Sequence, residues 1–495
     1  MPWCCAVPRR AAVTDWPERR RRQAALDALD ARLARSPDSI DIRFERACLL
    51  TELGRSDDAR AAYLELLARA PDHAGALNNF GTLLHATGYR TAARTAYAEA
   101  AARHPEQPMG HVNLANLLLE AGALDAARAH YETALRLAPD HAEAHQGFGN
   151  LLAELGDAEG AARHRERGFR GRAVTTLPYR GSGAPLPLLL LVSAEGGNVP
   201  IRPLLDDRVF LTSVVMAEYF DPSLPLPPHA LIFNAIGDAD LCQPALDAVT
   251  QILARSSAPV VNHPSAIAPT GRADNARRLA GLPDVVVPRI VSLPRSALAA
   301  RDAPAVLARE GLAFPLLLRS PGFHTGRHFV RVERAEDLAA AVQALPGGVL
   351  TAIQPLDARG PDRKWRKYRV MFVDGRLYPL HLAVSDHWKV HYFTADMADK
   401  PSHRAEEAAF LADMPCVLGR RGMAALEAVR DALALDYAGV DFAVGDEGQI
   451  LLFEANATMV VNPPEADQRW AYRRPAVARI HDAVRAMLLG RARPA

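Results

Sequence analysis

The chain has 495 residues, which is room for several domains because a single domain usually holds about 100–200 residues. Lysine and arginine number 58 and aspartate and glutamate 57, so the formal net charge is only +1. Hydrophobic residues make up 49% of the chain and charged residues 23%. This composition excludes a disordered chain, a coiled-coil rod and a strongly basic nucleic-acid-binding protein.

The cysteines and the N-terminal segment indicate a reducing compartment. The cysteines are odd in number and lack the paired spacing of a zinc site: Cys4, Cys5, Cys48, Cys242 and Cys416. Residues 1–22 contain no apolar segment of signal-peptide length, and no run of about 18 uncharged apolar residues occurs anywhere. We therefore expect a cytoplasmic protein without a membrane partner.

The first third of the sequence repeats itself every 34 residues. Three residue types recur with this period: Pro37, Pro71, Pro105 and Pro139; Gly54, Gly88, Gly122 and Gly156; Ala59, Ala93, Ala127 and Ala161. Each copy predicts two amphipathic helices, the first ended by the glycine and the second followed by the proline. Helix pairs of this kind bury their apolar faces only by stacking, so the pattern predicts a helical solenoid with a concave groove.

This pattern resembles the tetratricopeptide repeat over about residues 40–170, with a capping helix at 17–36. The expected organisation is a tail at 1–16 and a solenoid of four repeats plus that helix at 17–170. Five amides lie near positions that line the groove in that family: Asn78, Asn79, Asn113, Asn116 and Asn150. Such amides can hydrogen-bond an extended peptide, or asparagine is simply common at these positions of the repeat. The expected partner is a peptide or carrier protein in the groove.

A segment at 171–186 is rich in Gly, Ser and Pro. Its apolar residues follow neither the helical nor the strand periodicity, so the segment predicts a linker. Beyond it, short apolar runs alternate with helix-like segments over about 187–265, a pattern typical of a parallel sheet with helices against it. From residue 266 onward strands recur beside helices without regular alternation. This part predicts an α+β sandwich around a cleft.

The sequence from Tyr437 to Asn456 predicts a β-hairpin that turns at Gly445–Gly448. If Val444 pairs with Gln449, Asp441 faces Leu452 and Glu454 is its diagonal neighbour on the same face, about 7–8 Å away between Cα atoms. Asn456 follows on that face. Two carboxylates and an amide suit Mg²⁺, which prefers oxygen ligands. The alternative is an ordinary solvated hairpin face.

Two further segments carry positive charge. Arg319 precedes a turn containing Gly322 and Gly326, whose backbone N–H groups could cradle phosphate, although such a turn can also be only a hairpin loop. Lys367 and Arg369 share one face of a strand by period 2, where they can meet an anion or merely protect a solvated edge.

With these motifs, the second half resembles the ATP-grasp superfamily of ligases over roughly residues 187–490. The resemblance implies that VDFAV and LLFEANAT hold the metal, with Asp441, Glu454 and Asn456 as Mg²⁺ ligands. It implies that Arg319 and Arg272 contact ATP. It divides the region into an α/β N-terminal part at 187–293 and a nucleotide- and metal-binding domain at 294–495.

The same resemblance makes Ile353–Asp357 the adenine hinge, with Gln354, Leu356 and Asp357 as nucleotide contacts, and aims Arg369 at the transferred phosphoryl group beside Lys367. Two departures from the family pattern stand out: arginine replaces both expected lysines, and ATMVV replaces the usual Pro-Gly after the asparagine. Arginine is not a conservative substitute for lysine.

The implied activity is ATP- and Mg²⁺-dependent amide ligation. ATP phosphorylates a carboxylate, and an amine displaces phosphate from the acyl phosphate. His381, His387 and His391 lie near the proposed site in the sequence, where one could orient an acceptor, although histidines on strands are more often structural. Two alternatives are a small-molecule kinase of the same fold and a tetratricopeptide scaffold with a degenerate nucleotide-binding domain.

Overall fold

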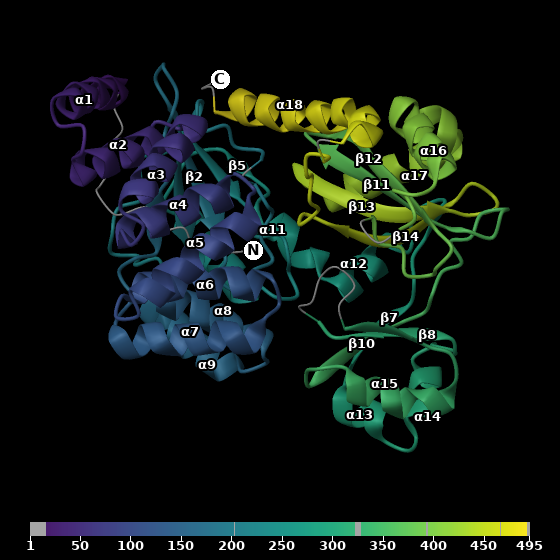
Figure 1. Ribbon diagram of the computed structural model, residues 1–495. Coiled ribbons are helices and arrows are strands. Elements are labelled where there is room, and N and C mark those ends of the chain that lie inside the picture. Colours follow the sequence, from purple (N-terminus) through teal and green to yellow (C-terminus); the bar gives the residue numbers. More distant parts are fainter. Residues whose placement is uncertain (1–15, 202, 322–327, 393–394, 466, 493–495) are drawn as a thin grey trace. The chain divides into compact units, whose positions relative to one another are not determined.

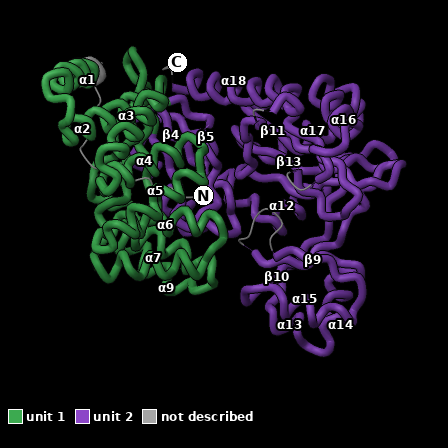
Figure 2. Tube along the Cα trace, in the orientation of Figure 1, with its two compact units in different colours: residues 1–188, 207–228 green, residues 189–206, 229–495 purple. Residues whose placement is uncertain are grey.

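The computed structural model forms two compact units (Figure 2). The first contains residues 1–188 and 207–228, and the second contains residues 189–206 and 229–495. The parts of the chain that the structure describes are residues 16–201, 203–321, 328–392, 395–465 and 467–492.

The first unit begins with an all-helical solenoid, as the 34-residue period predicted. In the described part of this region, α1 (Trp16–Arg35) precedes four helix pairs that follow one another in chain order (Figure 1). The first helices of the pairs are α2 (Ile40–Glu52), α4 (Ala74–Ala86), α6 (Pro108–Glu120) and α8 (Ala142–Glu154). The second helices are α3 (Ser56–Arg69), α5 (Arg90–Arg103), α7 (Leu124–Leu137) and α9 (Ala158–Phe169).

The periodic glycines end the first helix of each pair. Gly54, Gly88, Gly122 and Gly156 have φ angles between 73° and 89°, a left-handed conformation that costs glycine little. In the first pair the Arg55 N–H then donates to the Leu50 carbonyl at 2.9 Å, and the same bond recurs in the other three. This is the Schellman arrangement, which satisfies carbonyls at the helix end.

The periodic alanines let the helices approach one another. Ala59, Ala93 and Ala127 are fully buried, and Ala161 is 1% exposed. A larger side chain at these positions would force the paired helices apart, because protein interiors are close-packed. The repeat pattern therefore predicts close helix packing, through its alanines, as well as the helix ends, through its glycines.

The segment predicted as a linker contains a short strand, β1 (Val174–Thr176). It pairs antiparallel with β3 (Phe210–Met216), with Val174 opposite Val215. Both strands are rich in β-branched residues, which favour extended structure. Their pairing joins segments that lie far apart in the sequence, which a local pattern does not reveal.

The second unit begins as a mixed α/β arrangement. β2 (Leu186–Val192), which crosses from the first unit into the second, neighbours β4 (Leu231–Asn234), and β4 runs parallel to β5 (Val260–Val261). Helix α10 (Gln243–Leu253) connects these two parallel strands, as their sequence alternation predicted. Its buried face includes Leu246 and Val249.

A four-stranded antiparallel sheet follows in the second unit. Its order is β7 (Ile290–Pro294), β10 (Val349–Ile353), β8 (Leu316–Arg319) and β9 (Phe329–Val332). One face packs in a common core with the helices α13 (Arg295–Ala299), α14 (Ala303–Arg309) and α15 (Leu338–Ala344) (Figure 1). Because side chains alternate along a strand, Leu350 and Ala352 enter this core whereas Thr351 points to the other face.

A five-stranded sheet forms the rest of the second unit. Its order is β12 (Arg376–Ser385), β11 (Trp365–Val373), β13 (Tyr437–Val444), β14 (Ile450–Asn456) and β6 (Val285–Val286). The helices that contact this sheet are α12 (Arg272–Leu279), α16 (Pro401–Ala412), α17 (Met414–Leu433) and α18 (Arg474–Arg491). Helix α11 (Pro264–Ile267) contacts α10. β11 and β12 form a hairpin that turns at Asp374 and Gly375, both with positive φ. Within the described ranges, no helix has the length and apolar character needed to cross a bilayer.

Candidate functional site

The two carboxylates of the predicted hairpin lie directly opposite each other. Asp441 on β13 pairs with Glu454 on β14, and Gly439 pairs with Asn456. The register predicted from the turn was wrong, because Val444 pairs with Ile450 and Phe442, not Asp441, faces Leu452. An irregularity between Asp441 and Phe442 leaves Phe453 as an extra residue on β14. This bulge brings the carboxylates closer than a regular ladder would, and opposite residues share one sheet face.

Asp441 is held by two cations from the neighbouring strand. Arg369 on β11 donates two hydrogen bonds to its carboxylate, at 2.6 and 2.8 Å, and the Lys367 ammonium lies 3.0 Å away. Asp441 is only 3% exposed. Burial alone raises the pKa of this carboxyl, but the charges of Arg369 and Lys367 outweigh it and hold the pKa far below its ordinary value.

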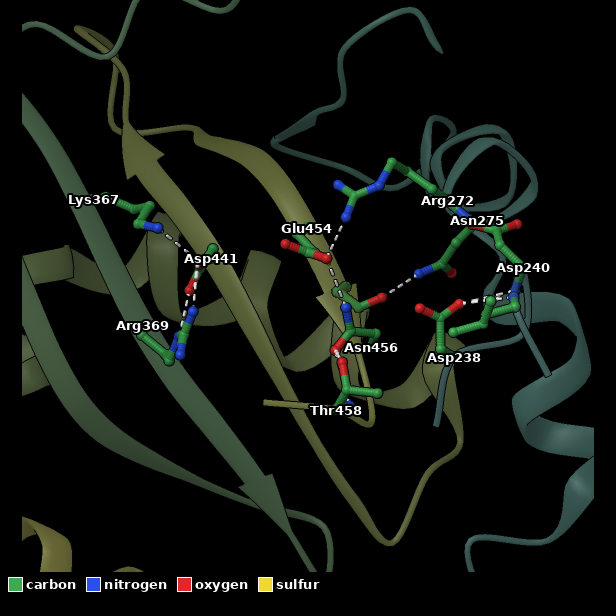
Figure 3. Close-up of polar contacts among 12 residues, drawn as sticks. Asp238, Asp240, Arg272, Asn275, Lys367, Arg369, Asp441, Glu454, Asn456 and Thr458 are labelled. Atoms are coloured by element: carbon green, nitrogen blue, oxygen red, sulfur yellow. Dashed lines mark hydrogen bonds and ion pairs between the residues drawn. The ribbon is translucent and has the colours of Figure 1, made fainter. Parts of the chain in front are cut away.

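Glu454 receives its partners from a helix and from its own strand. Arg272, the first residue of α12, donates to Glu454 Oε1 at 2.5 Å, and the Asn456 amide donates to the same oxygen at 2.9 Å (Figure 3). Burial raises the Glu454 pKa, yet Arg272 turns the net shift downward. Asn275 anchors α12 to this strand through a 2.6 Å bond to the Ala455 carbonyl. The carboxylates are therefore ionised and surrounded by positive charge.

A pocket of about 380 Å³ lies in the second unit. Its walls come from the four-stranded sheet, from β14 of the five-stranded sheet and from α12. Its apolar wall includes Ile290, Leu452 and Phe453. The polar and charged lining consists of Asp238, Asp240, Thr270, Arg272, Asn275, Ser292, Arg319, Thr351, Glu454 and Asn456. This combination of an apolar wall and converging polar groups is typical of small-molecule sites.

Two guanidinium groups share this pocket. Burial and the nearby charge of Arg272 lower the pKa of Arg319 to about 10. Arg319 remains charged at neutral pH, because even this lowered pKa lies well above 7. Guanidinium groups can bind an anion such as phosphate. The same lining also holds three carboxylates, those of Asp238, Asp240 and Glu454.

Several other predicted site residues lie outside the pocket lining. The Gln354 side chain accepts from the Ala313 N–H at 2.8 Å, and Asp357 pairs with Arg359. Leu356 packs against a buried cluster that includes Ala443. Asp441, Lys367 and Arg369 are also outside the lining, although Asp441 lies directly opposite Glu454 on the next strand.

The loop turn at Gly322 and Gly326 lies outside the described residues. Sequence reasoning missed Asp238 and Asp240, which follow β4 and line the pocket. Asp240 accepts a 2.7 Å bond from the Arg272 backbone N–H, and this contact fixes the start of α12. Carboxylates just after a buried strand were the available signal, because ligands often bind at the carboxyl ends of parallel strands.

One of the three histidines near the site is buried beside Arg369. His381 on β12 pairs with Arg369 in the sheet register and is 6% exposed. Burial and the positive charge of Arg369 keep its pKa well below the ordinary value, so the ring is neutral. Its ring centroid lies 4.7 Å from that of Tyr392. These contacts fit a packed structural residue.

Among the described residues, no group of three or more His, Cys, Asp or Glu side chains is arranged to hold a metal ion. Asp441 and Glu454 provide two acidic side chains, and Asn456 adds a neutral amide. Any cation here would therefore need further oxygen ligands from water or from a bound phosphate.

In the solenoid, the five predicted amides hydrogen-bond to other parts of the repeats. Three of these contacts join neighbouring helices: Asn113 donates to Asn78 at 3.0 Å, and Asn116 and Asn150 accept from Tyr131 and Arg165. Asn79 donates to the Cys48 sulfur at 3.3 Å. These amides hold helices together, so fewer of their hydrogen-bonding groups remain for a bound peptide.

Comparison with known proteins identifies the first part of the chain. The tetratricopeptide-repeat family model matches residues 18–74, 44–108, 78–142 and 112–164. The N-terminal region is a tetratricopeptide-repeat region. Repeats of this kind act as a scaffold for protein interaction. No curated protein matches the chain.

Solved structures match about a third of the chain. MamA 41-end from Desulfovibrio magneticus RS-1 is 20% identical, with 29% of this chain and 81% of that chain covered and a TM-score of 0.27. PilF of Pseudomonas aeruginosa is 22% identical, covering 31% and 70% with a TM-score of 0.29. Cut9 with Hcn1 from the APC/C is 15% identical, covering 31% and 29% with a TM-score of 0.29.

Proposed function

We propose that the second unit is an ATP- and Mg²⁺-dependent carbon–nitrogen ligase and that the tetratricopeptide repeats recruit its peptide or protein partner. The observation that supports this most is the pocket between two sheets, in which Arg272 and Arg319 face the carboxylate of Glu454. Cations and carboxylates converge there from segments nearly two hundred residues apart. Phosphoryl transfer needs this kind of positioning and charge neutralisation, and it needs no protein nucleophile.

The metal ligands of this proposal are Asp441, Glu454 and Asn456. All three present oxygen atoms on one face of β13 and β14, and both carboxylates are ionised. The donor chemistry fits Mg²⁺, which binds one or two carboxylates together with substrate phosphates. When bound, the ion would neutralise charge on the transferred phosphoryl group. It would compete with Arg272 for Glu454 and with Lys367 and Arg369 for Asp441.

The chain's own cations supply the rest of the proposed chemistry. Arg272 and Arg319 bind phosphate oxygens in the pocket. Arg369 and Lys367, which are held on one strand face by Asp441, stabilise the charge that develops as a carboxylate is phosphorylated. An amine then displaces phosphate and forms the amide. Tethering the partner to the repeats raises its effective concentration at this site.

Two measurements test the ligase. Mg-ATP should raise the melting temperature of the second unit, because a ligand that binds only the folded state stabilises it. Phosphate release, measured with peptides and amino acids supplied singly and in pairs, should require a carboxylate and an amine together. Phosphate retained on a single acceptor would instead show a kinase, and release without either acceptor would contradict both.

A scaffold without nucleotide chemistry is the second candidate. Both carboxylates already have protein cations as partners, with Arg272 on Glu454 and Arg369 and Lys367 on Asp441. Contacts satisfied in this way hold β11 to β13 and α12 to β14 without any ligand. No change in melting temperature with Mg-ATP, together with normal partner binding by the repeats, would favour this candidate.

A further inference from the structure

The side chains of the proposed cation site are already engaged by donors of this chain (Figure 3). Glu454 Oε1 accepts from the Arg272 guanidinium at 2.5 Å and from the Asn456 amide at 2.9 Å. Asp441 accepts from Arg369 through both of its carboxylate oxygens, at 2.6 and 2.8 Å. The protein's own positive groups therefore hold the carboxylates that a metal ion would need.

The Asn456 amide points its nitrogen, rather than its oxygen, at Glu454. Its Oδ1 accepts from the N–H and from the hydroxyl of Thr458, both at 2.9 Å. Thr458 belongs to the ATMVV segment in which this chain departs from the expected Pro-Gly. The amide must turn and lose these bonds before its oxygen can reach a cation beside Glu454. All three proposed ligands are thus held by this chain itself.

The charges around the site give a bare cation no net attraction. Among the described residues, the cations of the pocket lining and of the Asp441 network are Arg272, Arg319, Lys367 and Arg369. The carboxylates of the same two sets are Asp238, Asp240, Asp441 and Glu454. A divalent ion that enters alone meets as much positive charge as negative. An anion that enters with it, or before it, changes this balance in its favour.

Arg272 opposes a cation at either oxygen of Glu454. A cation at Oε1 must displace the guanidinium, and a cation at Oε2 would lie beside it, where the two positive charges repel each other. This repulsion is only partly screened by water, because the Arg272 side chain is 23% exposed and that of Glu454 is 31% exposed. Removal of the Arg272 charge should therefore strengthen cation binding.

An anion in the pocket gives the Arg272 side chain a second partner. The Arg272 backbone N–H is fixed to Asp240 at 2.7 Å, and Asn275 fixes α12 to the Ala455 carbonyl at 2.6 Å. The guanidinium can therefore change partner while the helix stays in place. Arg319 lines the same pocket, and burial and the charge of Arg272 lower its pKa. An anion between the two guanidinium groups relieves their repulsion.

We propose that Arg272 is a gate that withholds Glu454 from divalent cations until a phosphate anion enters the pocket. This inference rests on the proposed nucleotide site and adds an order to it. The anion binds first, Arg272 turns from Glu454 to a phosphate oxygen, and the released carboxylate then accepts the cation. A free divalent cation therefore does not fill the site in the absence of nucleotide.

The unmodified full chain tests this order without any substitution. Calorimetry in EDTA should detect binding of metal-free ATP, because the gate opens toward an anion. Binding of Mg-ATP but not of metal-free ATP would overturn the order and leave the proposed nucleotide site standing. Binding of neither form would remove the nucleotide site and the gate together.

Arg272→Gln identifies the gate by two changes of opposite sign. Its affinity for Mn²⁺ alone, a probe for Mg²⁺ that electron paramagnetic resonance detects, should rise at least about tenfold as a competing bond to a charged group is lost. Its affinity for metal-free ATP should fall at least about tenfold, because a charged phosphate contact is lost. An arginine that only binds phosphate would leave Mn²⁺ affinity unchanged, and one that only supports the fold would weaken both. Either result would overturn the proposal.

Matched variants separate charge from other effects. Arg272→Lys keeps the positive charge, so its Mn²⁺ affinity should stay within about threefold of the unmodified chain. Glu454→Gln, added to Arg272→Gln, should remove the gained Mn²⁺ binding. Arg277→Gln, in the same helix with a 76% exposed side chain, is the control and should change either affinity by less than about twofold. A gain that survives Glu454→Gln, or equal gains in Arg272→Lys and Arg272→Gln, would contradict the proposal.

Discussion

The solenoid and the pocket of the second unit are stabilised by contacts of very different range in the sequence. In the solenoid, side chains bond to residues close in the chain, as Tyr131 does to Asn116, 15 positions away. At the pocket, Arg272 meets Glu454 across 182 positions, and Arg369 meets Asp441 across 72. Local contacts appear as a repeating pattern, whereas long-range contacts form only when the whole unit folds. Changes in the solenoid should therefore have local effects, and changes at the pocket should affect function and the packing of distant segments together.

The largest expected effect concerns the pocket. Glu454→Gln removes a charge that faces Arg272 and the proposed cation, so ATP-dependent turnover should fall at least about 100-fold. Phosphate release measures it. Glu447→Gln, whose side chain is 78% exposed, is the control and should keep full turnover. Undiminished turnover in Glu454→Gln would show that Glu454 is not a metal ligand.

The next effect concerns the stability of the second unit. Asp441→Ala leaves Arg369 and Lys367 without their buried partner, which should destabilise the unit by about 3–5 kcal/mol. Hydrogen exchange of β11 and β13 measures the loss. Asp431→Ala removes a partner from the more exposed pair with Arg430, so it should leave the stability of the unit almost unchanged. Equal costs for the two variants would show that the Asp441 network is not a structural link.

A substitution in the core of the solenoid should lower the free energy of unfolding by less, and only in the repeat that carries it. Ala127 is fully buried between helices, so Ala127→Leu overfills the third repeat and should destabilise it by about 1–3 kcal/mol. Ala126→Leu places the same side chain on the exposed face of α7 and should change stability by less than about 0.5 kcal/mol. Hydrogen exchange of each repeat is the measurement. A loss that extends to all four repeats would contradict the local character of this region.

The smallest expected effect concerns a helix end. Gly122 has a φ of 74° and open space around it, so Gly122→Ala meets no neighbour and costs only the backbone strain, about 1–2 kcal/mol. Gly183→Ala is the matched control, because that position also has open space but no positive φ, and it should be neutral within about 0.5 kcal/mol. Melting of the two variants separates the cost of the conformation from that of the added methyl group. A neutral Gly122→Ala would mean that the turn does not need this conformation.

Much of the solenoid could be predicted, since each helix end depends on a glycine or proline beside it. The site was predictable in part. The hairpin of β13 and β14 and the shared strand face of Lys367 and Arg369 follow from alternation and turn residues. The pairing of Asp441 with Glu454 could not be predicted in this way, because it depends on the extra residue Phe453 in β14. No glycine, proline or other turn residue marks the position of this bulge inside the apolar strand.

The sequence alone determined the period of the repeats, the glycines that end their helices and the residue types available for a cation site. Only the tertiary structure decided which cations face which carboxylates, that Asp238 and Asp240 join the pocket, and that the predicted groove amides bond to other parts of the repeats. The reason is physical: helix ends and turns depend on neighbouring residues, whereas ion pairs in a buried pocket depend on how separate strands and helices pack. Two histidine contacts lie between these cases: His111 with His130, and His145 with His164. The last two copies of the 34-residue period repeat these histidines, but only packing brings the two rings of each pair together.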